Sequence, residues 1–265
     1  MIQEENLFIL KTIWKYRHFI GAVIRYEFQT QYTKSILGSL WVIMNPLYMC
    51  IIYTTIFSYI VDIDSTKFSY TLYVATGLLA WNFFTDIVNR SQVIYINYGN
   101  IIKQQNCPLF CLPLVVLALA SMDFSISFGL FTVYLITTHT FPSWCYLGLI
   151  PVLLLQAIYA IGLGTILGLL NIFFRDVGRA TTIFLQVGFW LTPAVYLIEK
   201  LPNSVQYGLK LNPLTAIMAA YQTIIVHQEW PHWSTLWFPL FITLLVNSLA
   251  LKFYHQHIAD LLDEF

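Results

Sequence analysis

Charged side chains are scarce in this sequence. Asp, Glu, Lys and Arg together make up 10% of its 265 residues, whereas hydrophobic residues make up 58%. A soluble domain usually carries about 25% charged residues, which it needs to cover its surface. The shortage excludes an ordinary soluble protein of this size and favours one whose solvent is the lipid bilayer.

Two further absences narrow the function. The formal net charge is zero, so no basic surface excess indicates a nucleic-acid partner. Of the four cysteines, Cys107 and Cys111 are four positions apart, but Pro108 follows the first and no His lies nearby. Isolated thiols are therefore expected, and no metal site.

A phosphate-binding loop is also missing. The pattern G-x-x-x-x-G-K-[ST] does not occur, and no Gly is followed by Lys. ATP is therefore not expected to bind this chain by that route, and no cofactor is expected in it. If the chain takes part in ATP-driven work, a partner must supply the ATPase and bind its ATP and magnesium.

Long apolar runs are abundant. Six of them approach or exceed the roughly 20 residues that a membrane-spanning helix needs. They are Leu37–Val61, Thr71–Asn89, Leu109–Thr137, Tyr146–Phe174, Ala180–Ile198 and Leu236–Phe253. The sequence thus predicts an all-α polytopic membrane protein. Residues 1–36 form an N-terminal cytoplasmic region, 37–253 a six-helix transmembrane domain, and 254–265 a cytoplasmic tail.

Two shorter segments are expected to lie at the membrane rather than cross it. In the N-terminal arm, Lys11, Lys15 and His18 cluster on one side of a helical wheel opposite a broad apolar arc, as in a helix lying in the headgroup plane against lipid. Leu211–Val226 begins with a helix cap at Asn212 and Pro213 in the first turn. Only about 13 residues follow, too few to span, so short re-entrant helices are predicted between spans five and six.

The basic residues predict the orientation. With a cytoplasmic N-terminus, ten Lys and Arg fall in inside segments and three fall outside. The inside set is Lys11, Lys15, Arg17, Arg25, Lys34, Arg90, Lys103, Arg175, Arg179 and Lys252, and the outside set is Lys67, Lys200 and Lys210. This asymmetry predicts that both termini are cytoplasmic.

Asp123 is the most exceptional residue of the apolar runs. It lies in the middle of the third predicted span, where an ionised carboxylate is costly unless it is paired or hydrated. Asp123 could serve a proton relay or an ion site. It could also be satisfied inside the bundle by Ser121, Ser125 or a residue of another helix.

Rings and prolines gather in the first and fifth spans. Asn45-Pro46 and Thr192-Pro193 interrupt these spans, and proline breaks in membrane helices are tolerated where other groups satisfy the backbone, often along a pathway. Aromatic side chains are dense around them and could stack on the apolar faces of sugars. The hypothesis is that a subset faces a conduit, with Trp41, Tyr48, Phe184, Phe189 and Trp190 as the candidates.

The motifs resemble those of a known family. Arg25-Tyr26-Glu27-Phe28, Leu37-Gly38-Ser39-Leu40-Trp41, Gly77 through Phe84, Asn171 through Val177, Gln186 through Tyr196 and Leu211 through Leu214 are similar, in order, to the permease subunits of bacterial ABC exporters for O-antigen, capsule and teichoic-acid polysaccharides. Each motif is short. Together and in this order they are specific, and the match covers nearly the whole chain.

The resemblance implies an exporter of lipid-linked polysaccharide in the inner membrane, built as a homodimer with two copies of a cytoplasmic ATP-binding subunit. It implies a channel at the dimer axis. Contact with the ATPase is expected from the loop around Asn97, Asn100 and Lys103, and could involve Arg175 and Asp176. A non-cytoplasmic gate is expected at Asn212, Pro213 and Tyr221.

Two other functions stay open at this point. A proton-coupled secondary transporter or channel could use Asp123. A membrane acyltransferase could use His139 or a histidine of the C-terminal tail, although no acid or nucleophile lies near His139 in the sequence.

Overall fold

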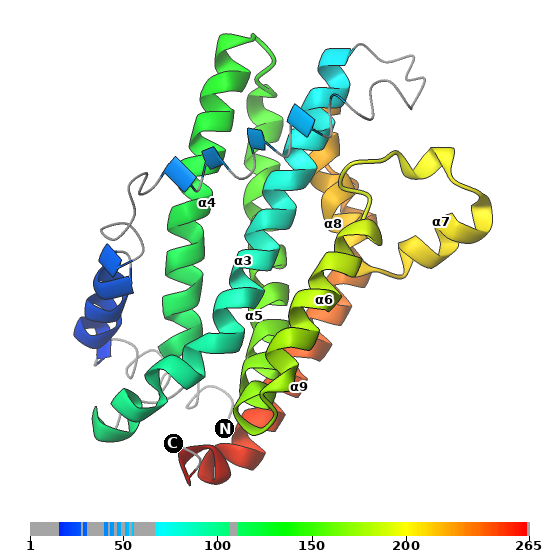
Figure 1. Cartoon of the computed structure of the whole chain (residues 1–265). Coiled ribbons are helices and arrows are strands. Elements are labelled where there is room, and N and C mark those ends of the chain that lie inside the picture. The colour runs from blue at the N-terminus through cyan, green and yellow to red at the C-terminus, as the bar shows by residue number, and fades with distance from the viewer. Residues whose placement is uncertain are drawn as a thin grey trace.

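The structure is a computed structural model that describes residues 16–27, 29–30, 40–41, 43–44, 47–48, 51–52, 55, 67–105 and 111–263. Most of the expected first span and most of the N-terminal arm, including Lys11, Lys15, Asn45 and Pro46, lie outside the described residues. The described part is helical, with α3, α4, α5, α6 and α9 as its main helices (Figure 1).

Four stretches among the described residues are long and apolar enough to cross a membrane: Tyr70–Tyr98, Cys111–Thr137, Trp144–Phe173 and Trp233–Gln256. They match the second, third, fourth and sixth predicted spans. The first two belong to α3 (Lys67–Gln105) and α4 (Cys111–Thr137). The others combine η1 (Ser143–Gly148) with α5 (Leu149–Phe173), and η4 (Trp233–Leu236) with α9 (Trp237–Asp263).

The predicted end of the second span was wrong. Asn89 was expected to end it, but α3 continues to Gln105, so Asn97–Lys103 is helix rather than loop and Arg90 lies within the helix. Toward its end α3 turns toward the N-terminal helical segment (residues 16–27) in Figure 1. There the Tyr98 hydroxyl donates a 2.6 Å hydrogen bond to Glu27 Oε1.

The fifth predicted span is shorter than expected. α6 (Asp176–Trp190) has 15 residues, or about 22 Å at 1.5 Å per residue, which is less than the roughly 30 Å hydrocarbon core. It ends just before Thr192-Pro193, as expected for a residue pair that disfavours helical backbone. Three short elements follow: η2 (Ile198–Lys200), α7 (Asn203–Lys210) and α8 (Pro213–Gln222), with the π-helical turn η3 (Thr223–His227) after them.

Prolines begin several of these helices rather than breaking them. Pro113, Pro151, Pro213 and Pro239 all lie within the first three residues of α4, α5, α8 and α9. In the first turn a backbone N–H has no intrahelical partner, so its loss there costs nothing. Asn212 caps α8 as predicted, because its side chain accepts a hydrogen bond from the Leu214 N–H at 3.0 Å.

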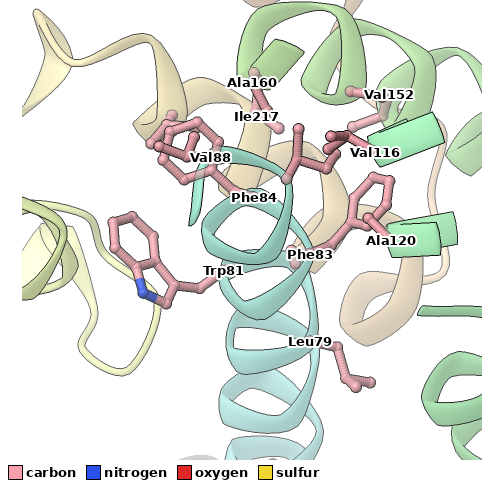
Figure 2. Packing of buried hydrophobic residues seen from close by; sticks show 14 of the residues in the cluster. Leu79, Trp81, Phe83, Phe84, Val88, Val116, Ala120, Val152, Ala160 and Ile217 are labelled. Atoms are coloured by element: carbon pink, nitrogen blue, oxygen red, sulfur yellow. The ribbon is translucent and has the colours of Figure 1, made fainter. Parts of the chain in front are cut away.

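The core surrounds α3, which packs against α4, α5, α6 and α8. Phe83 packs on Phe124 of α4 with ring centroids 4.6 Å apart, and Phe84 stacks on Tyr159 of α5 at 5.8 Å. Figure 2 shows Phe83 and Phe84 with other buried side chains of this core. A side chain at Gly168 of α5 would place its Cβ 2.3 Å from the Ser91 carbonyl oxygen. Lipid tails are as apolar as these side chains, so close packing rather than exclusion from water holds the helices together.

Candidate functional site: a neutral groove between α3 and α6

A groove of about 510 Å³ runs between α3 and α6. We call it the α3–α6 groove and define it by its lining residues. These are Leu78, Trp81, Asn82, Thr85, Asn89, Thr182, Leu185, Gln186, Phe189 and Trp190. The polar members recur at helical spacing, 82, 85 and 89 on α3 and 182 and 186 on α6, so each helix presents one polar stripe to the groove.

These polar side chains are open. Asn89, Thr182 and Gln186 are exposed and Asn82 is half-buried. The amides of Asn82 and Gln186 have no hydrogen-bond partner among the described residues. A polar group facing hydrocarbon without a partner is costly, so polar side chains in membrane helices normally face protein or a water-filled cavity. This face is therefore one that water, a substrate or another protein surface covers.

Aromatic rings form the wall of the groove. The Trp81 ring lies edge-on to Phe189, with centroids 5.7 Å apart, and Phe189 lies edge-on to Trp190 at 5.3 Å. Trp190 is 54% exposed, whereas Trp81 is 7% exposed. The buried Trp81 ring and the exposed Trp190 ring thus both contact Phe189, and all three rings line the groove.

A second hollow of about 580 Å³ lies on the other side of Trp81, between α5, α6, α7 and α8; we call it the α6–α7 cavity. Trp81 and Leu185 line both spaces. Phe184, which is 63% exposed, lines this cavity together with Asn212 and Pro213. The structure thus brings three α6 conduit candidates and two gate candidates to adjoining spaces.

The remaining conduit candidates do not meet them within one copy of the chain. Trp41 and Tyr48 are 57% and 42% exposed and line neither space. The described first-span residues Ile43, Leu47 and Ile51 lie instead against α3 and α4, in an apolar crevice. The conduit role of Trp41 and Tyr48 stays a prediction.

The chain that follows α6 is non-helical, yet several of its backbone carbonyls accept hydrogen bonds from side chains. The Tyr70 hydroxyl donates to the Val195 carbonyl at 2.7 Å, and the Tyr73 hydroxyl to the Tyr196 carbonyl at 3.0 Å. Gln222 Nε2 donates to the Pro193 carbonyl at 3.1 Å, and Asn212 Nδ2 to the Leu191 carbonyl at 3.1 Å. Irregular backbone at membrane depth is tolerated only when its polar groups are satisfied in this way.

Close packing adds to this attachment. A Cβ built at Gly77 of α3 would lie 2.2 Å from the Ala194 carbonyl oxygen, so only glycine lets α3 approach the break this closely. Tyr221 of α8 is buried, and its hydroxyl donates at 2.7 Å to Gln156 Oε1, whose Nε2 donates to the Ala80 carbonyl at 2.7 Å. The end of the groove, the break and α8 are therefore joined into one hydrogen-bonded unit.

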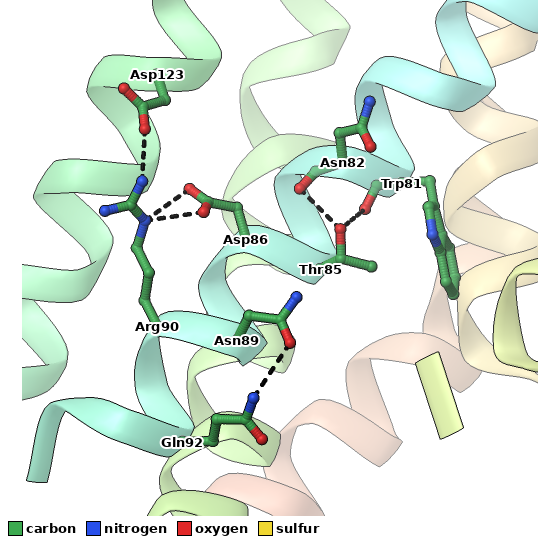
Figure 3. Close-up of polar contacts among 8 residues, drawn as sticks. All are labelled: Trp81, Asn82, Thr85, Asp86, Asn89, Arg90, Gln92 and Asp123. Atoms are coloured by element: carbon green, nitrogen blue, oxygen red, sulfur yellow. Dashed lines mark hydrogen bonds and ion pairs between the residues drawn. The ribbon is translucent and has the colours of Figure 1, made fainter. Parts of the chain in front are cut away.

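Asp123 lies on the opposite side of α3. Arg90 Nη2 donates to Asp123 Oδ2 at 2.5 Å, and Arg90 Nε donates to both carboxylate oxygens of Asp86, at 2.8 and 2.9 Å (Figure 3). The expectation that a residue of another helix satisfies Asp123 is confirmed, and that residue is Arg90. Arg90, which the orientation count assigned to an inside segment after the second span, lies within α3, because the helix continues through it.

The predicted ATPase contacts gather at one end of the bundle. In Figure 1 the C-terminal end of α3 and the turn between α5 and α6 lie at the same end. Asn97, Arg175 and Asp176 are exposed there. Asn100 and Lys103 lie on the same stretch of α3, and their side chains are outside the described ones.

Asn171 fixes that turn. Its Nδ2 donates to the Gln92 carbonyl of α3 at 2.8 Å, and its Oδ1 accepts from the Gly178 N–H in the first turn of α6 at 3.0 Å. This amide accounts physically for the first residue of the motif that runs from Asn171 to Val177.

His139, the candidate for acyl transfer, has a conformational role. It is exposed in the turn after α4 with φ 57°, the left-handed conformation that ends helices. Within the described residues, no three His, Cys, Asp or Glu side chains are grouped so that they could hold a metal ion.

Sequence reasoning missed the amides of the groove. Trp81 was noted only as one of many rings, and Asn82, Thr85, Asn89 and Gln186 were not proposed as site residues. Their signal was available, since polar residues recur at 82, 85 and 89 within an apolar run.

Comparison with known proteins adds a family to this geometry. The profile described as ABC-2 type transporter matches residues 18–226. The O-antigen export system permease protein RfbA of Klebsiella pneumoniae is 27% identical over 202 residues, covering 76% of this chain and 77% of that protein. RfbA of Myxococcus xanthus is 24% identical over 225 residues, covering 84% and 86%. The polysialic acid transport protein KpsM of Escherichia coli is 22% identical over 200 residues, covering 75% and 78%.

Proposed function

Because this chain belongs to the ABC-2 type transporter family, we propose that it is the transmembrane subunit of an ATP-driven polysaccharide exporter. The observation that carries the proposal is the α3–α6 groove, where amides, hydroxyls and rings line an open face of helices buried in a membrane. An uncharged, hydroxyl-rich chain with apolar C–H faces fits such a wall.

The cargo is a lipid-linked polysaccharide of the O-antigen, capsule or teichoic-acid type, and the route lies at the axis of a homodimer. A single copy supplies only an open groove. A second copy facing α6 would close the groove into a channel, which supports the dimer because the polar stripes would then be covered on all sides.

The subunit lies in the inner membrane with both termini cytoplasmic. The basic asymmetry of the sequence supports this orientation even when Arg90, which is paired with Asp86, is left out, since nine basic residues then fall in inside segments and three fall outside. Six crossings result if the first span and α6 are added to the four longer helices, with the non-helical residues after Trp190 completing the crossing that the 15-residue α6 begins. α7 and α8 then form the non-cytoplasmic re-entrant gate, which includes Asn212, Pro213 and Tyr221.

ATP and magnesium are bound by two copies of a separate ATPase subunit at the cytoplasmic end. The exposed Asn97, Arg175 and Asp176 form the docking surface, with Asn100 and Lys103 beside them on α3. Asn171 links this surface to α3 and α6, which gives the ATPase a direct connection to both walls of the groove.

The test compares rings that line the groove or the cavity with a matched ring that does not. Trp190→Ala and Phe184→Ala should each lower surface polymer severalfold in cells that lack the native permease gene, because a sliding polymer loses a stacking surface. Phe241→Ala is the control, since Phe241 is 62% exposed on α9 and lines neither space.

Copurification of the ATPase subunit checks that each variant inserts and assembles. If both ring variants assemble and export as much polymer as the control, the groove is not the route.

A further inference from the structure

The lining of the α3–α6 groove is polar without being charged. Among its ten described lining residues, five carry amides or hydroxyls and none is Asp, Glu, Lys, Arg or His. The adjoining α6–α7 cavity likewise has no charged residue among its described lining. A wall of this kind can exchange hydrogen bonds with a moving chain, but it cannot neutralise a moving charge.

The charges of α3 are kept on another face. Asp86 and Arg90 lie within the same stretch of helix as Thr85 and Asn89, yet their side chains meet each other and Asp123 of α4 (Figure 3). Arg90 is therefore committed to two carboxylates. It does not offer a cation to the groove.

The charges of α6 lie at its beginning. Asp176 and Arg179 precede Thr182, the first lining residue of that helix, and none follows before Trp190. The predicted first span, Leu37–Val61, contains no Asp, Glu, Lys or Arg in its sequence. α6 and the predicted first span thus carry no charge along their apolar lengths, and α3 pairs its own charges away from the groove.

This distribution matters because a charge in a membrane path is expensive. An ionised group that leaves water for a low-dielectric site costs several kcal/mol unless a partner compensates it. A polymer with one carboxylate or phosphate in each repeat would meet that cost at every repeat. An uncharged polymer would exchange its water contacts for the open amides of Asn82 and Gln186.

We propose that the groove selects uncharged polysaccharides and discriminates against polymers that carry an anionic group in each repeat. The inference rests on the proposed function and narrows its cargo, because a teichoic-acid polymer carries a phosphate in each repeat and would be discriminated against. Gln186 is the position at which to change the selection, because its amide is exposed, lines the groove and has no partner among the described residues.

The experiment uses proteoliposomes that contain the chain and its ATPase subunit. The probes are two lipid-linked polymers of matched length and identical lipid: a neutral polymannose and a polysialic acid. The rate of ATP-dependent translocation of each polymer is measured for the wild type, Gln186→Lys and Gln186→Glu. The ATPase subunit is the same in every arm, so differences between variants arise in this chain.

We expect the wild type to move polymannose at least about tenfold faster than polysialic acid, a ratio that corresponds to about 1.4 kcal/mol. Gln186→Lys should narrow the ratio by supplying a cation, and Gln186→Glu should widen or preserve it. The two variants have side chains of similar length, so their difference reports the sign of the charge. Asn89→Lys is a second cation variant if Gln186→Lys fails to assemble.

Each other outcome overturns a specific statement. Equal rates for the two polymers in the wild type would refute the selection while leaving the exporter function intact. If Gln186→Lys and Asn89→Lys leave the ratio unchanged, the selection lies outside the groove and the inference is wrong. If an assembled, ATP-hydrolysing complex moves neither polymer, the proposed function itself fails.

Discussion

Two faces of α3 carry polar side chains over the same stretch of helix, and they are satisfied in opposite ways. Toward α4, Asp86, Arg90 and Asp123 form a closed set of ion pairs. Toward α6, the amide of Asn82 has no partner among the described residues, and neither has the amide of Gln186 on the facing α6. In a low-dielectric setting, a side chain stays charged only when the protein supplies an oppositely charged partner. A neutral amide can do without a protein partner and hydrogen-bond to water or to a passing polymer.

The largest effect should come from breaking the charged face. Arg90→Met leaves two carboxylates without their cation, and removing one partner of a buried ion pair typically costs about 3–5 kcal/mol. We expect a loss of this order in the free energy of unfolding, measured by SDS titration in mixed micelles.

The triple variant Asp86→Asn, Arg90→Met and Asp123→Asn serves as the control. It removes all the charge together and should recover most of the stability, because no unpaired charge is left. If Arg90→Met unfolds like the wild type, the ion pairs do not hold α3 to α4.

An intermediate effect should come from the end of α3 whose tyrosine hydroxyls donate hydrogen bonds to the non-helical backbone after α6. Tyr73→Phe removes the hydroxyl that donates to the Tyr196 carbonyl and leaves that carbonyl with one donor fewer. Loss of a partner for a buried polar group costs about 1–3 kcal/mol.

The same SDS titration measures the change. Tyr159→Phe is a matched control, because the Tyr159 ring packs on Phe84 and its hydroxyl makes no hydrogen bond within the described part of the chain. If the two variants lose equal stability, the captured carbonyl contributes nothing measurable.

The smallest effect on stability should come from the open face. Asn82→Leu removes an amide that has no partner among the described residues, so we expect a change within about 0.5 kcal/mol. Export should nevertheless fall severalfold, because the groove loses a group that exchanges hydrogen bonds with the polymer.

Surface polymer and SDS titration are measured on the same variant. A large destabilisation by Asn82→Leu would show that polar side chains on both faces of α3 stabilise the fold. The proposed difference between the two faces would then be wrong.

Much of the fold could be predicted because its signals are local. Apolar runs predicted α4, α5 and α9, and Thr192-Pro193 predicted an interruption in the fifth span, close to where α6 ends at Trp190. The extension of α3 to Gln105 could not be predicted, because polar residues after an apolar run mark the end of the hydrocarbon and say nothing about the end of the helix.

The site was harder to predict than the fold. Pairing of Asp123 with Arg90 joins residues 33 positions apart, and its geometry depends on how α3 packs on α4. The rings of α6 were identified from their density. The packing of α6 on α3 decides which of these rings line the groove. The same packing brings the rings next to the amides of α3.

The captured carbonyls after α6 also determine where the chain can change length. Residues 192–195 are buried, and their carbonyls are held by α3 and α8 at fixed positions. An added or deleted residue there would move every following carbonyl away from its donor. The turn at 228–230 is exposed and can absorb an insertion at little cost, because its backbone can reach water. Two segments that both precede α9 in the sequence should therefore respond differently to a change in length. Residues 192–195 should not accept an added or deleted residue, whereas the turn at 228–230 should.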